Sequence, residues 1–182
     1  MKAFFPILLI AVILASCGPE KPKALSDEQI KKEKEAVKNV IEKYNAAYTE
    51  KSLYKIVELL AKEPVFFGTD SAETINTMGD FQAEMTKQWS IFKEEKFGPM
   101  ADVSIQMDDH ASFASIIYGM PCEQIHIDGQ ITKIYLRYAR ILKKEKDKWV
   151  IVSGIAGATT KGQSNTELLQ KANAGQQTQE KK

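Results

Sequence analysis

SFASIIYGMPCEQIHIDGQITKIYLRYARIL, residues 112–142, is the stretch of sequence that decides the fold. Isoleucine and tyrosine, which favour strands, recur through it, and Asp128-Gly129 is the strongest hairpin signal in the chain. We therefore predict a long strand over 112–127, a tight turn, and a second long strand over 131–142.

The turn determines which residues face each other across this hairpin. A two-residue Asp-Gly turn places Ile127 opposite Gln130, and it places Cys122 opposite Tyr135. Pro121 has no N–H to donate to a strand ladder, so we expect it at a bulge or at an edge of the sheet.

Upstream of the hairpin, the apolar residues recur at helical spacing. Ser26 and Gln29 form a capping-box pattern, which predicts a first helix from there to about Tyr48. Ser52 is expected to cap a second helix that Pro64 ends. The apolar face of this second helix is predicted at Leu53, Ile56, Val57 and Leu60. A short strand over 65–67 precedes a third helix, whose apolar residues are Phe81, Met85, Trp89 and Phe92.

After Gly98-Pro99 the apolar period changes from helical to two, which predicts a strand over 103–107 before the hairpin. A charged loop over 143–148 then leads to a last strand over 149–155. Helices followed by a meander of antiparallel strands are an α+β order. This order argues against a doubly wound sheet, and no Gly-rich loop opens a helix as a nucleotide-binding fold would require.

Two segments in this order resemble parts of the NTF2-like family, in particular its SnoaL-like domains. Residues 67–73 (FGTDSAE) are similar to the turn after the first strand of those domains, and 137–142 with 148–152 resemble their final hairpin. The likeness covers about residues 30–160. It implies an α+β NTF2-like cone, with about three N-terminal helices packed on a strongly bent, mostly antiparallel sheet. It also implies a conical pocket and frequent dimerisation through the outer face of the sheet.

The N-terminus indicates where the protein works. Lys2 precedes a run without charge, and the run closes on Leu14-Ala15-Ser16-Cys17, which resembles a bacterial lipobox. Small residues before Cys17 suit a peptidase cleft. As a helix the run would be roughly 21 Å long, too short for a hydrocarbon core of about 30 Å. We therefore predict a lipoprotein signal peptide over 1–16 and lipidation of Cys17.

The remaining sequence fits a lipid-anchored protein. Removal of 1–16 takes away Lys2 and balances the basic and acidic residues, so nothing favours binding to nucleic acid. We expect a tether over 17–25, one domain over 26–160, and a polar, disordered tail over 161–182. The expected partner is the lipid bilayer, reached through acylated Cys17. Because Gly18 is not the aspartate of the best-known retention rule, we predict the outer membrane of a bacterial envelope, facing the periplasm.

Aromatic and charged residues are the candidates for lining the pocket. Tyr138 and Arg140 share one strand face, Tyr135 and Arg137 share the other, and the resemblance favours the first pair. The resemblance also makes Asp70 the one candidate for a catalytic base. The pocket candidates are Tyr44, Tyr48, Asp70, Trp89, Tyr138 and Arg140.

Other reactive residues offer little chemistry. His110 is expected in the turn Asp108-Asp109-His110 and His126 beside the tight hairpin, both peripheral, and Cys122 is expected to be buried. No spacing of His, Cys and Asp fits a metal site, so we expect neither a metal nor a cofactor.

Three functions fit these features. The first is a non-catalytic module that binds a small apolar or anionic molecule, or that forms a homodimer. The second is an enzyme of the SnoaL or ketosteroid-isomerase type, in which Asp70 transfers a proton. The third is an accessory subunit of an envelope complex. We expect the first, because the chain shows no convincing acid–base pair.

Overall fold

The computed structural model describes residues 24–69 and 71–159. The predicted signal peptide over 1–16, lipidated Cys17, most of the tether, Asp70 and the tail over 161–182 lie outside the described residues. No helix in the described ranges is both long enough and apolar enough to cross a membrane.

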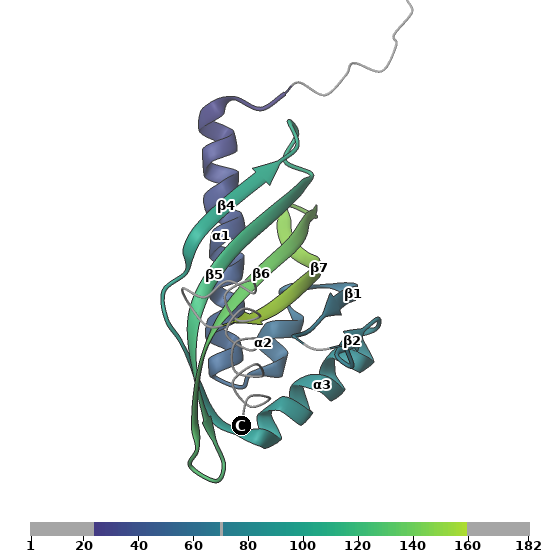
Figure 1. Cartoon of the computed structure of the whole chain (residues 1–182). Helices are drawn as coiled ribbons and strands as arrows, with labels where there is room; N and C mark the ends of the chain where they lie inside the picture. Colours follow the sequence, from purple (N-terminus) through teal and green to yellow (C-terminus); the bar gives the residue numbers. More distant parts are fainter. Residues whose placement is uncertain (1–23, 70, 160–182) are drawn as a thin grey trace, which may run out of the picture.

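Three helices pack on one curled sheet, which confirms the predicted α+β fold (Figure 1). The helices are α1 (Asp27–Thr49), α2 (Leu53–Val57) and α3 (Met78–Ile91). The strands are β1 (Leu60–Phe67), β2 (Thr74–Ile75), β3 (Phe92–Phe97), β4 (Ala101–Met107), β5 (Phe113–His126), β6 (Ile131–Glu145) and β7 (Lys148–Thr159). The strand order is β2-β1-β7-β6-β5-β3, and β4 also pairs with β5. Only β1 and β7 pair in parallel, so the described sheet is mostly antiparallel.

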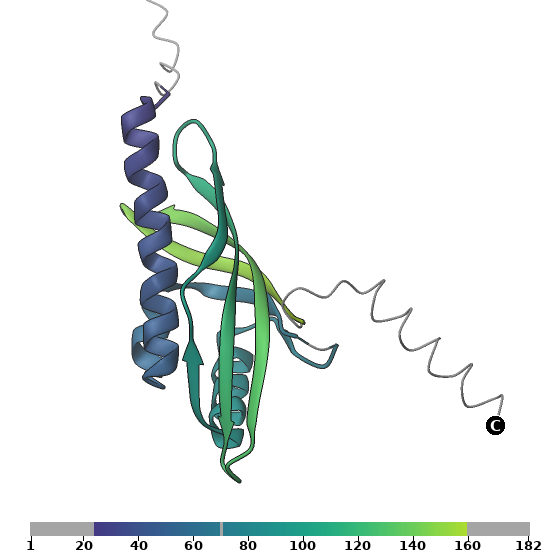
Figure 2. The same cartoon turned by 60° about the vertical axis from the view of Figure 1, so that its left-hand side comes forward.

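Helix α1 begins as predicted and stands along one face of the sheet (Figure 2). The Ser26 side chain accepts from the N–H of Gln29, and the Gln29 side chain accepts from the N–H of Ser26. These two bonds satisfy N–H groups that have no partner within the helix. The buried face of α1 repeats at helical spacing through Val37, Ile41, Tyr44 and Ala47. Just before the helix, the N–H of Leu25 donates to the carbonyl of Asp109, so the end of the expected tether is docked on the domain.

The prediction for the second helix was wrong in its length. Helix α2 ends at Val57, and Leu60 begins strand β1, which contains Pro64. The register between β1 and β7 shifts between Leu60 and Val65, so Pro64 occupies an irregular part of the ladder where its missing N–H costs little. Ser52 makes no side-chain capping bond.

The third helix was predicted to include Phe92, and this was also wrong. Phe92 is extended and begins strand β3, which pairs with the second half of β5. The sequence of β3, FKEEKF, has no alternation of apolar and polar residues, so its pattern did not indicate a strand.

The β5–β6 hairpin forms, but its predicted register is off by one residue. The N–H of His126 donates to the carbonyl of Gln130, so the loop has three residues and Cys122 pairs with Ile134 instead of Tyr135. Gly129 has φ +89°, and a three-residue loop places glycine at this left-handed position.

Pro121 lies where β5 changes partners. On one side β5 pairs with β4 up to Gly119, and beyond Pro121 it pairs with β3 from Cys122 onward. Between these ladders the N–H of Gly98 donates to the Pro121 carbonyl, 2.9 Å away. The change of partner removes the need for an N–H at Pro121, so the residue is neither at a bulge nor on an edge strand.

Candidate functional site

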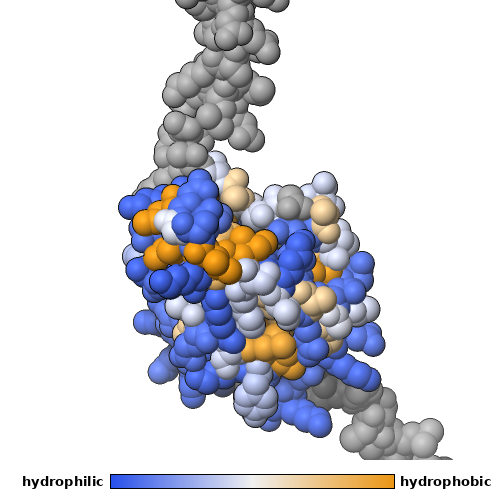
Figure 3. All heavy atoms as spheres, turned by 90° about the horizontal axis from the view of Figure 1, so that it is seen from below, coloured by the Kyte–Doolittle hydropathy of each residue, from blue (hydrophilic) through white to orange (hydrophobic). Residues whose placement is uncertain are grey.

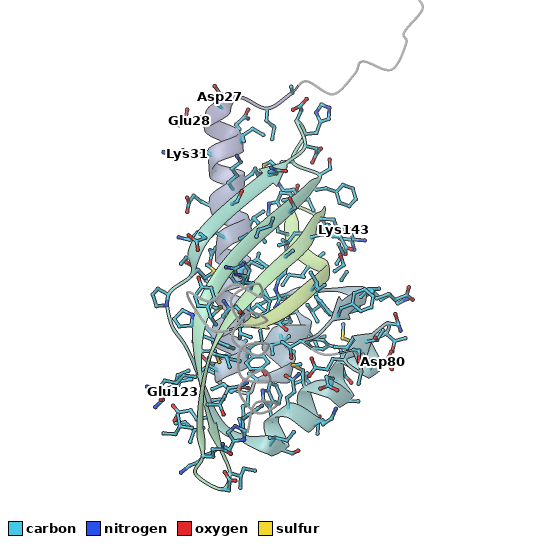
Figure 4. The ribbon with its side chains drawn as sticks, viewed as in Figure 1. Asp27, Glu28, Lys31, Asp80, Glu123 and Lys143 are labelled. Carbon is cyan, nitrogen blue, oxygen red and sulfur yellow. The ribbon has the colours of Figure 1, made fainter. Side chains whose placement is uncertain are left out.

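A cavity of about 480 Å³ lies between α1, α3 and the inner face of the sheet. Figure 4 helps to place it: Asp27, Glu28 and Lys31 mark one end of α1, and Asp80 and Glu123 lie toward the opposite end of the molecule. Because the cavity is lined by the second half of α1 and by α3, it lies toward that opposite end. Its apolar wall includes Phe66, Phe81, Ile75, Met85, Ile134 and Leu136. The volume suits a small organic molecule.

Arg140 forms the cationic part of the cavity wall. Strand β6 turns its side chain inward, where it is only 6% exposed. Its Nε donates to the Tyr118 hydroxyl at 3.2 Å. The guanidinium carbon lies 4.3 Å from the ring centroid of Tyr44 and 5.0 Å from that of Tyr138. Within the described ranges, no carboxylate forms a salt bridge with Arg140.

The environment keeps this guanidinium charged. Burial lowers the pKa of Arg140, and the oxygens of Tyr118, Tyr44 and Tyr138 raise it by more, but they exert that effect in full only when they are ionised. The pKa values of Tyr44 and Tyr138 are raised as well, mainly by burial, although the charge of Arg140 opposes the change. Tyr44 and Tyr138 are therefore neutral, and among the described residues the cation is stabilised by their ring faces and by one hydroxyl rather than by an anion.

Glu95 forms a second polar part of the wall, and it is also 6% exposed. Its Oε2 accepts from the Tyr48 hydroxyl at 2.8 Å, and its Oε1 accepts from Nε2 of Gln124 at 2.9 Å. The Tyr48 oxygen also lies 2.7 Å from Oε1 of Gln88. Burial and the nearby charge of Glu95 raise the pKa of Tyr48, so this hydroxyl keeps its proton.

Sequence reasoning missed Glu95. It lies inside the charged run KEEK, which is typical of a solvated surface. Only the strand geometry of β3 shows that Glu95 points inward while its neighbours Glu94 and Lys96 are exposed. The inward position of Glu95 could have been predicted from the sequence only if β3 had been recognised as a strand.

The structure brings Tyr44, Tyr48, Tyr138 and Arg140 to one cavity. Trp89, in contrast, is not among the lining residues. Its ring packs edge-on against Tyr48, with 5.9 Å between centroids. Its buried Nε1 has no hydrogen-bond partner within the described residues.

The segment around Asp70 can be described only on either side of that residue. The backbone N–H and the hydroxyl of Thr69 both donate to Oε2 of Glu73, and the N–H of Gly68 donates to the Glu73 carbonyl. A Cβ on Gly68 would overlap the Glu73 side chain, so this turn requires glycine. The turn is therefore closed by Glu73, which also lines the cavity.

The other pair of candidates on β6, Tyr135 and Arg137, lies on the outer face of the sheet, away from the cavity. Arg137 is exposed there, whereas Tyr135 is buried, with its ring against Gly119 of β5.

The histidines and the cysteine lie apart from the cavity lining. His110 is exposed, whereas Nε2 of His126 lies 3.1 Å from the Thr132 hydroxyl and its ring packs on Phe92. Burial, with a smaller effect of Glu95, raises the pKa of the Cys122 thiol to about 12, which makes it a poor nucleophile. In the part of the chain that the structure describes, no group of three or more His, Cys, Asp or Glu could hold a metal ion.

The end of the molecule that carries the hairpin tip is partly apolar. Ile127 and Ile131 of the hairpin are exposed, and the Ile127 N–H donates to the carbonyl of exposed Ile91. Figure 3, which views the molecule from below, shows apolar areas among hydrophilic ones on this end. Ile91 also lines the cavity, so part of the cavity rim is apolar.

Solved structures show that this chain has the NTF2-like fold. An NTF2-like superfamily protein from Salmonella enterica aligns over 75% of this chain and 97% of its own, with a TM-score of 0.65 and 14% identity. A candidate scytalone dehydratase from Novosphingobium aromaticivorans aligns over 77% and 100%, with a TM-score of 0.68 and 8% identity. A candidate association domain of calcium/calmodulin-dependent protein kinase II, from Xanthomonas campestris, aligns over 69% and 86%, with a TM-score of 0.60 and 18% identity.

These identities are low, so the likeness shows the fold alone. No family model and no curated protein matches the sequence. The fold occurs among proteins named as enzymes and among proteins named as association domains, so the function has to be argued from the site.

Proposed function

We propose that this chain is a lipid-anchored protein of a bacterial envelope whose cavity binds a small molecule with an apolar body and an anionic group. The observation that carries the proposal is Arg140, a buried cation in the wall of a cavity, without a carboxylate partner among the described residues.

Burial of the Arg140 charge has an energetic cost. A charge held away from water costs several kcal/mol unless another group compensates it. The ring faces of Tyr44 and Tyr138 and the hydroxyl of Tyr118 offset part of this cost. A planar guanidinium still offers paired N–H groups that match the two oxygens of a carboxylate. A carboxylate in the cavity would therefore complete the site, and the apolar wall would hold the rest of the molecule.

The inward-facing charged groups are held in place, which suits the binding of a ligand. Tyr118 holds Arg140, and Tyr48 with Gln124 holds Glu95. Rigid, pre-oriented groups reduce the entropy that a ligand loses on binding.

Calorimetric titration of residues 18–182 tests this proposal with hexanoate, octanoate and 4-phenylbutanoate, each compared with the alcohol of the same carbon skeleton. We expect at least one carboxylate to bind ten-fold or more tightly than its alcohol. Arg140→Gln should remove that preference, and Arg137→Gln on the outer face should keep it. If no carboxylate binds better than its alcohol to the wild-type protein, the proposal is wrong.

The membrane anchor is the second part of the proposal, and the lipobox-like sequence ending at Cys17 supports it. Residues 18–24 span at most about 25 Å when extended, because Leu25 is docked on the domain. The cavity is lined from Tyr44 onward, about 26 Å further along α1. The anchor would thus hold the domain near the membrane, with the cavity toward the far end.

Metabolic labelling with a radioactive fatty acid tests the anchor. Expressed in a bacterium, the full-length chain should be labelled and should sediment with outer membranes. Cys17→Ala should abolish the label, whereas Cys122→Ala should retain it. Undiminished labelling of the Cys17 variant would exclude the anchor.

A row of apolar side chains favours a second role, homodimerisation through the outer face of the sheet. Phe113, Ile117 and Ile141 lie on one face of β5 and β6, because Ile141 pairs with Ser115, which is two residues from each of the other two. Their side chains are 54%, 57% and 46% exposed, and none of them lines the cavity. A contiguous exposed apolar area of this kind is typical of an interface.

Light scattering tests this second role. Residues 18–182 should be a dimer at micromolar concentration, and Ile117→Lys should give a folded monomer. Tyr54→Lys, at an exposed position on α2, is the matched control and should stay dimeric. A wild-type monomer would contradict this second role.

A further inference from the structure

The cavity wall contains a second buried charge, and this charge also forms no salt bridge among the residues that the structure describes. Glu95 and Arg140 are the two charged side chains that are buried within residues 24–69 and 71–159, and both line the same cavity. No salt bridge within 4 Å joins them to each other or to any other described residue. The molecule therefore presents one buried anion and one buried cation to a single ligand-sized space.

The hydrogen bonds of Glu95 leave part of its carboxylate unused. An ionised carboxylate can accept about four hydrogen bonds. Gln124 supplies one donor, and the single hydrogen of the Tyr48 hydroxyl is shared between Glu95 and Gln88 as acceptors. At most two donors thus reach a group that can accept four. The unused acceptors belong to a side chain that lines the cavity.

Glu84, another carboxylate of the cavity wall, differs from Glu95 because it has a cationic partner. Its Oε2 lies 3.5 Å from Nζ of Lys87 and its Oε1 accepts from Nε2 of Gln88, so its charge is balanced within α3. Glu95 has neutral donors only, Tyr48 and Gln124. Neutral donors offset the loss of water in part, but a buried anion without a cation remains costly.

The two charged groups, Arg140 and Glu95, contact α1 at positions that are one helical turn apart. Tyr44 lies against Arg140, and Tyr48, one turn further along the helix, donates to Glu95. Residues four apart in a helix are separated by about 6 Å along its axis. The two charged groups therefore lie at different positions along the wall, and the apolar side chains of Phe81, Met85 and Leu136 belong to the same lining.

We propose that the ligand is dipolar: it carries a carboxylate that pairs with Arg140 and an ammonium group that pairs with Glu95, with an apolar spacer between them. This inference rests on the proposed binding function and specifies its ligand class. An ammonium group fits better than a hydroxyl because it supplies both the missing positive charge and up to three donors.

The experiment compares ω-amino acids with the plain carboxylates of equal chain length, so that no spacing has to be assumed. The pairs are 4-aminobutanoate with butanoate, 6-aminohexanoate with hexanoate and 8-aminooctanoate with octanoate, titrated calorimetrically into residues 18–182. At one length the amino acid should bind at least ten-fold more tightly than its partner. The ω-hydroxy acid of that length should not reproduce the gain.

Two variants test which side chain binds the ammonium group of the ligand and which binds its carboxylate. Glu95→Gln preserves the shape of the side chain, and it should erase the advantage of the amino acid over the plain carboxylate of equal length. Arg140→Gln should weaken both ligands. Glu94→Gln, on the exposed side of the same strand, is the matched control and should change neither. Circular dichroism verifies that each variant is folded.

The outcomes separate this inference from the function on which it rests. If carboxylates bind wild type but the amino group adds nothing at any length, or if the hydroxy acid binds as tightly, the dipolar ligand is wrong and anion binding stands. An advantage that survives Glu95→Gln would also overturn it. If neither series binds, the proposed function itself fails.

Discussion

The two faces of the long strands β5 and β6 each depart at a few positions from the usual pattern of a half-buried sheet. The inner face, which is covered by helices, contains a charged residue, Arg140. The outer face presents Ile117 and Ile141, which are 57% and 46% exposed. A sheet that only covers a core would place the isoleucines inside and the arginine outside.

The buried Arg140 and the exposed isoleucines each cost free energy in the isolated protein, and a binding partner would reduce that cost. A buried cation without an anion favours a ligand, and an exposed apolar row favours a protein surface. The inner and outer faces therefore suggest two separate functions, one within the cavity and one between molecules. Substitutions at neighbouring positions can test the two faces independently.

The largest expected effect comes from adjacent isoleucines on β5. Ile116 is fully buried on the inner face, and Ile117 next to it points outward. Ile116→Ala should lower the free energy of unfolding by about 2 to 5 kcal/mol, because it removes packed methylenes and leaves a cavity. Ile117→Ala should cost roughly 0.5 kcal/mol or less. Urea denaturation at a concentration where the protein is monomeric measures both.

Equal costs for the two isoleucine variants would contradict the assignment of the faces. A large loss at Ile117 that grows with protein concentration would instead show that this side chain is buried in a dimer.

The second comparison uses the two arginines of β6. In the absence of ligand, Arg140→Met should raise the free energy of unfolding by about 1 kcal/mol, because it removes a buried charge that has no salt-bridge partner in the described part of the chain. The gain is limited because the Tyr118 hydroxyl loses its donor. Arg137→Met, on the exposed side, should change stability by roughly 0.5 kcal/mol or less. Thermal unfolding measured with and without the best-binding carboxylate checks this: the ligand should stabilise wild type and Arg137→Met, but not Arg140→Met.

A marked destabilisation of ligand-free Arg140→Met would show that the arginine is structural. In that case its ring contacts with Tyr44 and Tyr138 would be the reason for its presence, and no ligand would be needed to explain it.

The sequence was a good guide to the fold where local chemistry determines structure. The capping box at Ser26 and the Asp-Gly turn predicted the start of α1 and the central hairpin, and the structure contains both. Prediction failed where contacts between distant residues decide. Leu60 joins a strand because β7 lies beside it, and Phe92 leaves the helical path because β5 pairs with it. No local pattern contains that information.

In the candidate site, too, the sequence predicted the residues that a local pattern indicates and missed the one that depends on distant contacts. The period of two along β6 showed that Tyr138 and Arg140 share a face, and both line the cavity. Glu95 was out of reach because its strand has no apolar alternation, and its burial depends on Tyr48 and Gln124, far away in sequence.

The last comparison concerns Glu33 of α1, a charge that does have partners within the described residues. Its two carboxylate oxygens accept from Lys144 at 2.6 Å and from the Trp149 indole at 2.7 Å, which ties α1 to β6 and β7. Burial tends to raise the pKa of Glu33, but these hydrogen bonds outweigh it, so the pKa is lowered from its ordinary value of 4.5. A lowered folded-state pKa means that the ionised carboxylate stabilises the fold fully above about pH 4.5. This contribution is lost as the pH falls through the folded pKa.

Glu33→Gln should therefore lower the free energy of unfolding by about 1 kcal/mol at pH 7. The difference from wild type should shrink steadily below pH 4.5, as the wild-type carboxyl takes up a proton. Glu35→Gln, exposed on the same helix, should show no such dependence. Urea titrations between pH 3 and pH 7 measure all three proteins. A difference that stays constant over this range would mean that Lys144 and Trp149 bind the neutral side chain as well as the ion, and Glu33 would then no longer contrast with Arg140 as the charge whose partner the chain itself supplies.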